Sequence, residues 1–182
     1  MPRNIALIGC GAIAHEIYLP ALAKLREMFD SLWLVDPDSA ALKEALSILP
    51  TKSALCLAEV TDDLQFVIIA SPNGLHFAMA KEALARGAHA LIEKPFVVWP
   101  EEGRELLAIS RSMNRVVAVN QPRRTLRNTL ELRNRQARGD FGALRSIEHN
   151  EGNKLKWPFR SGAAFTPTAQ RVGVIMDIGV HV

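Results

Sequence analysis

The sequence is poor in cysteine and contains no long apolar segment. Its 182 residues include two cysteines, Cys10 and Cys56, which cannot build a disulfide framework and lack the clustered partners of a metal site. No apolar run approaches the roughly 18 residues that a membrane span needs. The first residues, MPRNIALIGCGAIA, place one basic side chain before a strand-like run, which is not the pattern of a signal peptide. These absences exclude a disulfide-rich secreted protein and a membrane protein, so we expect a cytoplasmic protein.

The composition otherwise lies within the ordinary range for a globular protein. Hydrophobic residues make up 48% of the chain and charged residues 23%, which excludes wholesale disorder. The net charge of +3 is concentrated in one stretch, Pro122 to Arg138, which has one acid, Glu131, and six arginines: Arg123, Arg124, Arg127, Arg133, Arg135 and Arg138. A nucleic-acid surface is one interpretation of such a cluster. Because the charges recur every three or four residues and no aromatic side chain is interleaved, we favour a solvated helix face and expect no nucleic-acid partner.

Strand-like and helix-like segments alternate through the first 120 residues. Short apolar runs predict strands at 5–8, 32–35, 55–57, 66–70, 89–92 and 115–119. Helical patterns or helix-start signals occupy the intervals, at about 13–28, 40–48, 73–86 and 100–113. This alternation predicts an α/β fold, a parallel sheet doubly wound by helices on both faces. Beyond it we expect the arginine-bearing helix, one strand over about 144–149, and a helix start near 175–181.

A glycine-rich turn follows the first predicted strand. Gly9-Cys10-Gly11-Ala12-Ile13-Ala14 reads G-x-G-x-x-A and opens a predicted helix, as in Rossmann dinucleotide-binding domains. Asp36 closes the second strand 22 residues after Ala14, where an acid hydrogen-bonds the adenosine ribose and repels a 2′-phosphate. Neither Pro37 nor Asp38 supplies a cation for such a phosphate. The pattern predicts a nicotinamide dinucleotide as cofactor, with NAD favoured over NADP.

Two further motifs lie at the ends of predicted strands. Ser71-Pro72-Asn73, with His76 three residues on, follows the fourth strand, and Glu93-Lys94-Pro95 follows the fifth. Ligands bind at strand carboxyl ends in open α/β sheets, so Lys94 is well placed for chemistry. From the tripeptide alone, a loop charge is an equally good interpretation.

Together these motifs, with Asp177-Ile-Gly-Val-His181, resemble the Gfo/Idh/MocA family of oxidoreductases. The resemblance implies an NAD-binding Rossmann domain over residues 1–121 and the N-terminal part of a substrate domain, built on an open sheet, over residues 122–182. It implies transfer of hydride between the cofactor and a secondary alcohol of a sugar, cyclitol or related polyol. Lys94, Asp177 and His181 match the family's catalytic positions, and Ser71, Pro72, Asn73, His76, Glu93 and Pro95 match positions at the cofactor channel. Arg124 falls where the family usually has an arginine after the sixth strand.

The chemistry of these residues suits the implied roles. Hydride leaves carbon only as the hydroxyl proton is removed, so a base must lie within hydrogen-bond reach. His181 titrates near neutrality, and Asp177, one helical turn earlier, can orient it. The Lys94 ammonium would stabilise the developing alkoxide.

The sequence also departs from the family pattern. Four to six residues before Asp177 the family usually has two or three glycines, but this chain has only Gly173. Asn120-Gln121-Pro122 follows the sixth strand, where glycine and an aromatic residue are more common in the family. We expect the chain to be the front part of a longer protein that is a homo-oligomer at full length. Two alternatives remain open: a catalytically incomplete dinucleotide-binding fragment, and an NAD-dependent glycoside hydrolase.

Overall fold

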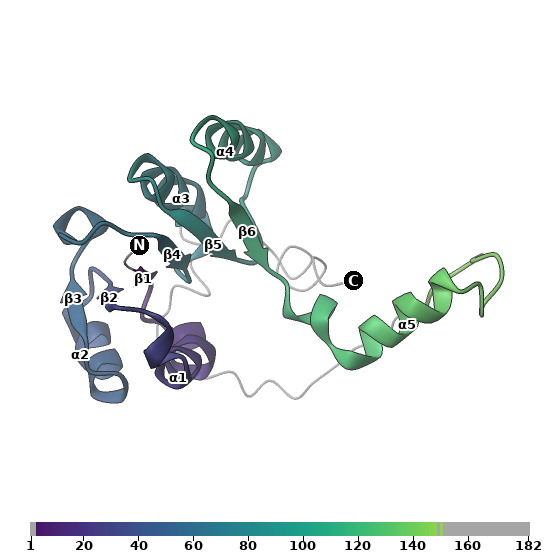
Figure 1. Ribbon diagram of the computed structural model, residues 1–182, viewed down its shortest axis with the longest axis horizontal. Coiled ribbons are helices and arrows are strands. Elements are labelled where there is room, and N and C mark those ends of the chain that lie inside the picture. The colour runs from purple at the N-terminus through teal and green to yellow at the C-terminus, as the bar shows by residue number, and fades with distance from the viewer. Residues whose placement is uncertain (1–2, 149, 151–182) are drawn as a thin grey trace.

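The computed structural model describes residues 3–148 and 150, and its centre is a six-stranded parallel sheet (Figure 1). The strands are β1 (Asn4–Ile8), β2 (Ser31–Val35), β3 (Lys52–Ala54), β4 (Phe66–Ile69), β5 (His89–Glu93) and β6 (Val117–Asn120). They lie in the order β3-β2-β1-β4-β5-β6, and every neighbouring pair is parallel. This is the strand order of two mononucleotide-binding halves, so the predicted fold class is confirmed for the described residues.

Helices cover both faces of the sheet. The helices are α1 (Leu19–Lys24), α2 (Ser39–Ile48), α3 (His76–Ala85), α4 (Pro100–Ser112) and α5 (Arg127–Ala137). A π-helical turn, η1 (Ala14–Tyr18), precedes α1, and single 3₁₀ turns lie at η2 (Arg26–Met28), η3 (Leu57–Glu59), η4 (Asn73–Leu75) and η5 (Pro122–Thr125). In Figure 1, α1 and α2 lie on one face of the sheet and α3 and α4 on the other, while α5 extends away from it.

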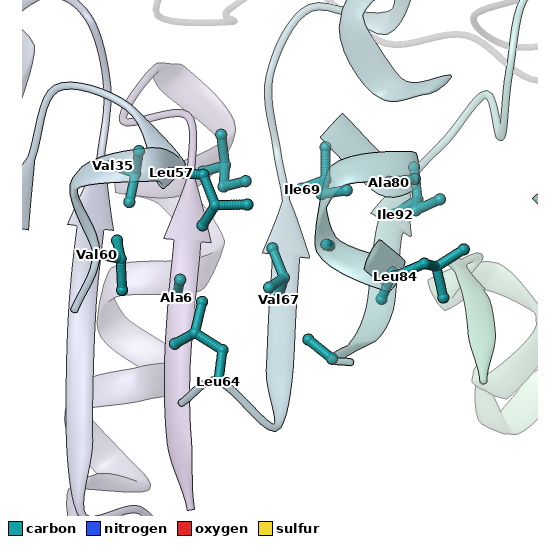
Figure 2. Packing of buried hydrophobic residues seen from close by; sticks show 14 of the residues in the cluster. Ala6, Val35, Leu57, Val60, Leu64, Val67, Ile69, Ala80, Leu84 and Ile92 are labelled. Atoms are coloured by element: carbon teal, nitrogen blue, oxygen red, sulfur yellow. The ribbon is translucent and has the colours of Figure 1, made fainter. Parts of the chain in front are cut away.

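The core consists of two apolar layers separated by the sheet. Successive strand residues alternate between them, so that Leu7 packs with the layer under α1 and α2 while Ala6 and Ile8 pack with the layer under α3 and α4. Figure 2 shows the second layer, in which Leu84 of α3 lies beside Ile92 of β5. Burial on both faces explains why the central strands are continuous apolar runs.

The prediction for the third strand is wrong by three residues. The strand was expected over 55–57, whereas β3 pairs Lys52 with Trp33 and Ala54 with Val35. Leu57 is buried, but in the η3 turn and not in a strand. Since β3 is an edge strand with a neighbour on one side only, its first two residues are polar and exposed, and the apolar pattern does not mark it.

The first helix begins where it was predicted, but only part of its expected apolar face is buried. The expected apolar face comprised Ile17, Leu22 and Leu25, yet Ile17 is 44% exposed and Leu25 is 47% exposed. Leu22 is buried as expected, and Tyr18 is buried in place of its neighbour Ile17. The π-helical turn has more residues per turn than an α-helix, so it rotates every later side chain relative to a pattern of period 3.6.

The segment after the sheet differs from its prediction in two ways. Arg124 lies in the η5 turn and not in the arginine-bearing helix, because Leu126 between them has an extended backbone. The other arginines from 127 to 138 are exposed on or next to α5, as expected for a solvated helix. The expected strand over 144–149 is not formed by residues 144–148, which have no regular secondary structure. Within the described part of the chain this segment has no neighbouring strand with which to pair.

Candidate functional site

The carboxyl ends of the strands gather the sequence motifs at one edge of the sheet. Gly9 follows β1, Asp36 follows β2, Ser71 lies just beyond β4, and Glu93 ends β5. Because the chain crosses from β3 at one edge to β4 beside β1, the helices after β1 and β4 lie on opposite faces. The crevice at such a switch point is the usual ligand site of an open α/β sheet.

The glycine turn brings the end of β1 against the end of β4. Gly9 has φ of +95°, and a Cβ atom there would lie 2.7 Å from the Ala70 carbonyl group and the Ser71 nitrogen. Only glycine fits such a turn, since both the backbone conformation and the contact exclude a side chain. At Gly11, by contrast, an added Cβ would meet no atom within 4 Å. The turn is therefore packed on its inner side and open at Gly11.

Asp36 accepts hydrogen bonds from the backbone of the glycine turn and from the backbone of its own turn. Its Oδ2 accepts from Cys10 N at 2.8 Å, and its Oδ1 accepts from Asp38 N at 2.9 Å. Each carboxylate oxygen has a second lone pair and can still accept a bond from a ribose hydroxyl. Burial, with a smaller contribution from the Asp36 charge, raises the pKa of the Cys10 thiol to about 12, so this cysteine is a neutral packing residue.

The segment after β4 is held to the segment after β5 by His76. Its buried ring lies between two backbone carbonyls, with Nδ1 2.9 Å from Pro95 O and Nε2 3.0 Å from Ser71 O. The buried ring thus joins the two predicted motifs. Asn73, one turn earlier, is also buried, and its Oδ1 has no hydrogen-bond donor in the structure.

Glu93 and Lys94 lie in a hydrogen-bonded cluster that the motifs only partly reveal. Glu93 is buried, and its Oε1 accepts from Tyr18 Oη at 2.6 Å and from Asn120 Nδ2 at 2.6 Å. Its Oε2 accepts from Lys94 N at 3.1 Å, and Lys94 is half-buried. Burial, together with the bond to Glu93 and its charge, raises the pKa of Tyr18 far above its usual range, so the phenol is a donor.

No motif of the sequence marks Tyr18 as a site residue, and Asn120 stands out only as a departure from the family pattern. Tyr18 is the single tyrosine of the chain, which is the one signal that draws attention to it. Its proximity to Glu93 depends on the π-helical turn, which periodicity does not predict.

The residues present fit a dinucleotide at this edge. The first intrahelical bond, from His15 N to Gly11 O, leaves the preceding amides without an acceptor inside the helix, where phosphate oxygens can bind. The open side of Gly11 gives room for the pyrophosphate, and Asp36 has free acceptor capacity for the ribose. The orphaned Asn73 oxygen is an additional buried acceptor at the end of β4.

Two predicted site residues, Asp177 and His181, lie outside the described residues and stay predictions from the sequence. Among residues 3–148 and 150, no group of three or more His, Cys, Asp or Glu side chains is arranged to hold a metal ion. No helix in that part of the chain is long and apolar enough to cross a membrane.

Comparisons with known proteins give a consistent result. The chain is 26% identical to D-glucoside 3-dehydrogenase of Escherichia coli, over 99% of this chain and 52% of that protein. It is 28% identical to UDP-N-acetylglucosamine 3-dehydrogenase of Acidithiobacillus ferrooxidans, over 96% of this chain and 50% of that protein. The chain therefore spans about half the length of these relatives.

Solved structures show the same fold. The WlbA dehydrogenase from Chromobacterium violaceum, in complex with NADH and UDP-GlcNAcA, matches with a TM-score of 0.71 and 28% identity over 78% of this chain and 41% of that one. The WlbA dehydrogenase from Thermus thermophilus matches with a TM-score of 0.73 and 24% identity, over 100% of this chain and 60% of that one. Residues 3–121 match the model of an oxidoreductase family with an NAD-binding Rossmann fold, and the chain belongs to this family, Gfo/Idh/MocA.

Proposed function

We infer that this protein is an NAD-dependent oxidoreductase that transfers hydride between a secondary alcohol of a sugar, cyclitol or related polyol and the nicotinamide. The observation that carries the inference is the placement of the glycine turn, Asp36 and Lys94 along one sheet edge. The relatives named as dehydrogenases of a glucoside and of a nucleotide sugar support the substrate class.

Each described residue has a part in this function that follows from its position. The amides after Gly11 hold the pyrophosphate, and Asp36 accepts hydrogen bonds from the adenosine ribose. The Lys94 ammonium stabilises negative charge on the substrate oxygen as its proton leaves. His181, oriented by Asp177, takes that proton in the role predicted from the sequence. The dinucleotide, when bound, supplies the hydride acceptor.

The cofactor preference tests the role of Asp36. NAD should bind more tightly than NADP by about 1–3 kcal/mol, because the 2′-phosphate would meet the carboxylate and displace its ribose bonds. Asp36→Ala should weaken NAD binding and abolish the preference. Calorimetric titration of both cofactors measures this.

Asp63→Ala is the matched control, since Asp63 is an exposed aspartate that precedes β4, at the opposite edge of the sheet. Its cofactor affinities should equal those of the wild type. Equal binding of NAD and NADP by the wild type would show that Asp36 does not face the ribose.

Lys94 is tested by turnover. Sugars, cyclitols and nucleotide sugars are screened for NADH absorbance with the 182-residue chain and NAD. On any substrate found, Lys94→Ala should lower kcat by about 100-fold or more while NAD still binds. Lys81→Ala on α3, whose exposed ammonium pairs with Glu105, should leave the rate unchanged.

Three outcomes of this screen separate the candidate functions. A fully active Lys94→Ala protein would contradict the role given to Lys94. NAD binding without turnover on any substrate would limit the function of this chain to dinucleotide binding. Cleavage of a glycoside without net NADH would instead favour the hydrolase alternative.

A further inference from the structure

Tyr18, Glu93 and Asn120 form a closed triangle of hydrogen bonds from three separate elements. Tyr18 Oη and Asn120 Nδ2 both donate to Glu93 Oε1 at 2.6 Å, and Asn120 Nδ2 also donates to Tyr18 Oη at 2.9 Å. The triangle therefore joins the turn that follows the glycine motif to the ends of β5 and β6. The other carboxylate oxygen, Oε2, accepts from Lys94 N, so the triangle extends directly to the backbone of Lys94.

Burying a carboxylate such as Glu93 at the end of a strand is unfavourable in free energy. A buried carboxylate loses its hydration and needs several hydrogen bonds to remain, whereas an apolar side chain would cost nothing of the kind. Tyr18 reaches Glu93 from a π-helical turn, a rare conformation that recurs at functional sites. The buried carboxylate and the π-helical turn, two features that folding alone does not favour, thus meet at one point on the carboxyl edge of the sheet. Their coincidence indicates a function beyond packing.

The position of the triangle along the sheet indicates which part of a dinucleotide it serves. In this fold the pyrophosphate lies at the turn after β1 and the adenosine ribose lies at the acid after β2. The second nucleotide half must then extend toward β4, β5 and β6, on the side of Glu93, Lys94 and Asn120. Asp36 and the triangle are therefore on opposite sides of the glycine turn in the strand order.

We propose that Tyr18 and Asn120 are positioning residues for the nicotinamide half of the cofactor site, acting through Glu93 on the backbone of Lys94. The proposal rests on the function inferred above. With the triangle intact, Glu93 has one orientation and Lys94 N has a fixed acceptor. Without the phenol or the amide, the carboxylate turns and Lys94 loses that support, while the adenosine side is unchanged.

The test compares two probes on the full 182-residue chain. NADH contacts the whole site, whereas ADP carries the adenosine and pyrophosphate but neither the second ribose nor the nicotinamide. Tyr18→Phe and Asn120→Ala should each weaken NADH binding about tenfold, the scale of one hydrogen bond to a charged group. ADP binding should stay within about twofold of the wild type, since its contacts are distant from the change. Calorimetry gives both affinities, and the emission of bound NADH should shift because it reports the surroundings of the nicotinamide.

Ser110→Ala is the matched control for a lost buried hydrogen bond. Ser110 is buried on α4, where its Oγ donates to Leu107 O, so its removal should lower the midpoint of thermal unfolding without changing the ratio of NADH to ADP affinity. ADP binding by each variant also shows that its domain is folded. The two substitutions share only the loss of the bond between Asn120 and Tyr18: Asn120→Ala leaves the bond from Tyr18 to Glu93 in place, and Tyr18→Phe leaves the bond from Asn120 to Glu93 in place.

The other possible results would contradict either this inference or the proposed function on which it rests. If the variants weaken NADH and ADP equally, or weaken neither, the triangle does not position the nicotinamide half. If the wild type binds NADH no more tightly than ADP, this inference is wrong while the adenosine site stands. If the wild type binds neither probe, the proposed function itself fails, and the inference fails with it.

Discussion

Asp62 accepts hydrogen bonds from three side chains of β2 and β3. Ser31 Oγ, Trp33 Nε1 and Lys52 Nζ all donate to its Oδ2, at 2.5, 2.9 and 2.9 Å. These bonds, that from Ser31 first, lower the pKa of Asp62 from 3.8 to about 2. They join β2 and the edge strand β3 to the segment before β4, at the sheet edge opposite the candidate site.

The stability contributed by Asp62 should depend on pH. Because its pKa is lower in the folded state, the contribution is fully present above pH 4 and is lost as the pH falls toward 2. Asp62→Asn should therefore lower the free energy of unfolding by about 1 kcal/mol at pH 7, after allowance for solvent screening, and by less at pH 2. Urea unfolding at both pH values measures the difference. The neighbouring exposed Asp63, changed to Asn, is the control, and a deficit for Asp62→Asn that is equal at both pH values would exclude the ionic contribution.

At the scale of single residues, the sequence predicts the site where one side chain or one turn is sufficient. The Gly9 turn follows from a local backbone requirement, and the structure confirms it. Tyr18 and Asn120 are different, because each acquires its role only when distant elements meet. Their contact with Glu93 spans 75 and 27 residues, which no local pattern encodes.

Among the strands, those buried on both faces were predicted more accurately than those at the edges of the sheet. The central strands β1, β2, β4 and β5 are apolar because helices cover both of their faces, and all four were predicted within one residue at either end. The edge strands have weaker patterns: β3 was expected three residues late, and β6 was expected over 115–119 but forms at Val117–Asn120. An edge strand has one hydrogen-bonded neighbour and more exposed side chains, so hydrophobicity locates it less accurately.

The start of the first helix was predicted from the sequence, but its buried face was predicted only in part. Its start follows from the glycine motif, but its buried face depends on how the turn packs against the sheet. The π-helical turn brings Tyr18 into the core and leaves Ile17 at the surface, the reverse of the expectation from periodicity. The predicted roles of the strand ends are insensitive to this rotation, which is why the glycine turn, Asp36 and Lys94 are placed as expected.

For the molecule as a whole, the sheet and its helices contain nearly all of the core that the described residues form. Among those residues, every buried hydrophobic side chain in both apolar layers lies between Ala6 and Leu106, and α5 has no buried residue. Along α5 the arginines are exposed, and Arg135 and Arg138 pair with Asp140 close to their own helix. Among the described residues, the elements that would hold the dinucleotide therefore do not depend on contacts from η5 or α5.

This separation predicts that residues 1–121 form an autonomous dinucleotide-binding domain. A chain ending at Gln121 keeps all six strands and the triangle at Glu93, and of the described elements it loses only η5 and α5, which bury nothing in the core. It should unfold cooperatively, with a midpoint within about 3 °C of that of the 182-residue chain, and bind NADH with the same affinity. Calorimetry and thermal unfolding of both chains measure this. A chain ending at Ser112 is the control: it lacks β6 and Asn120, leaves the β5 edge open and should bind NADH weakly or not at all. Loss of cooperative unfolding in the 121-residue chain would show that residues 122–182 stabilise the sheet, and the division of the chain at residue 121 would then be wrong.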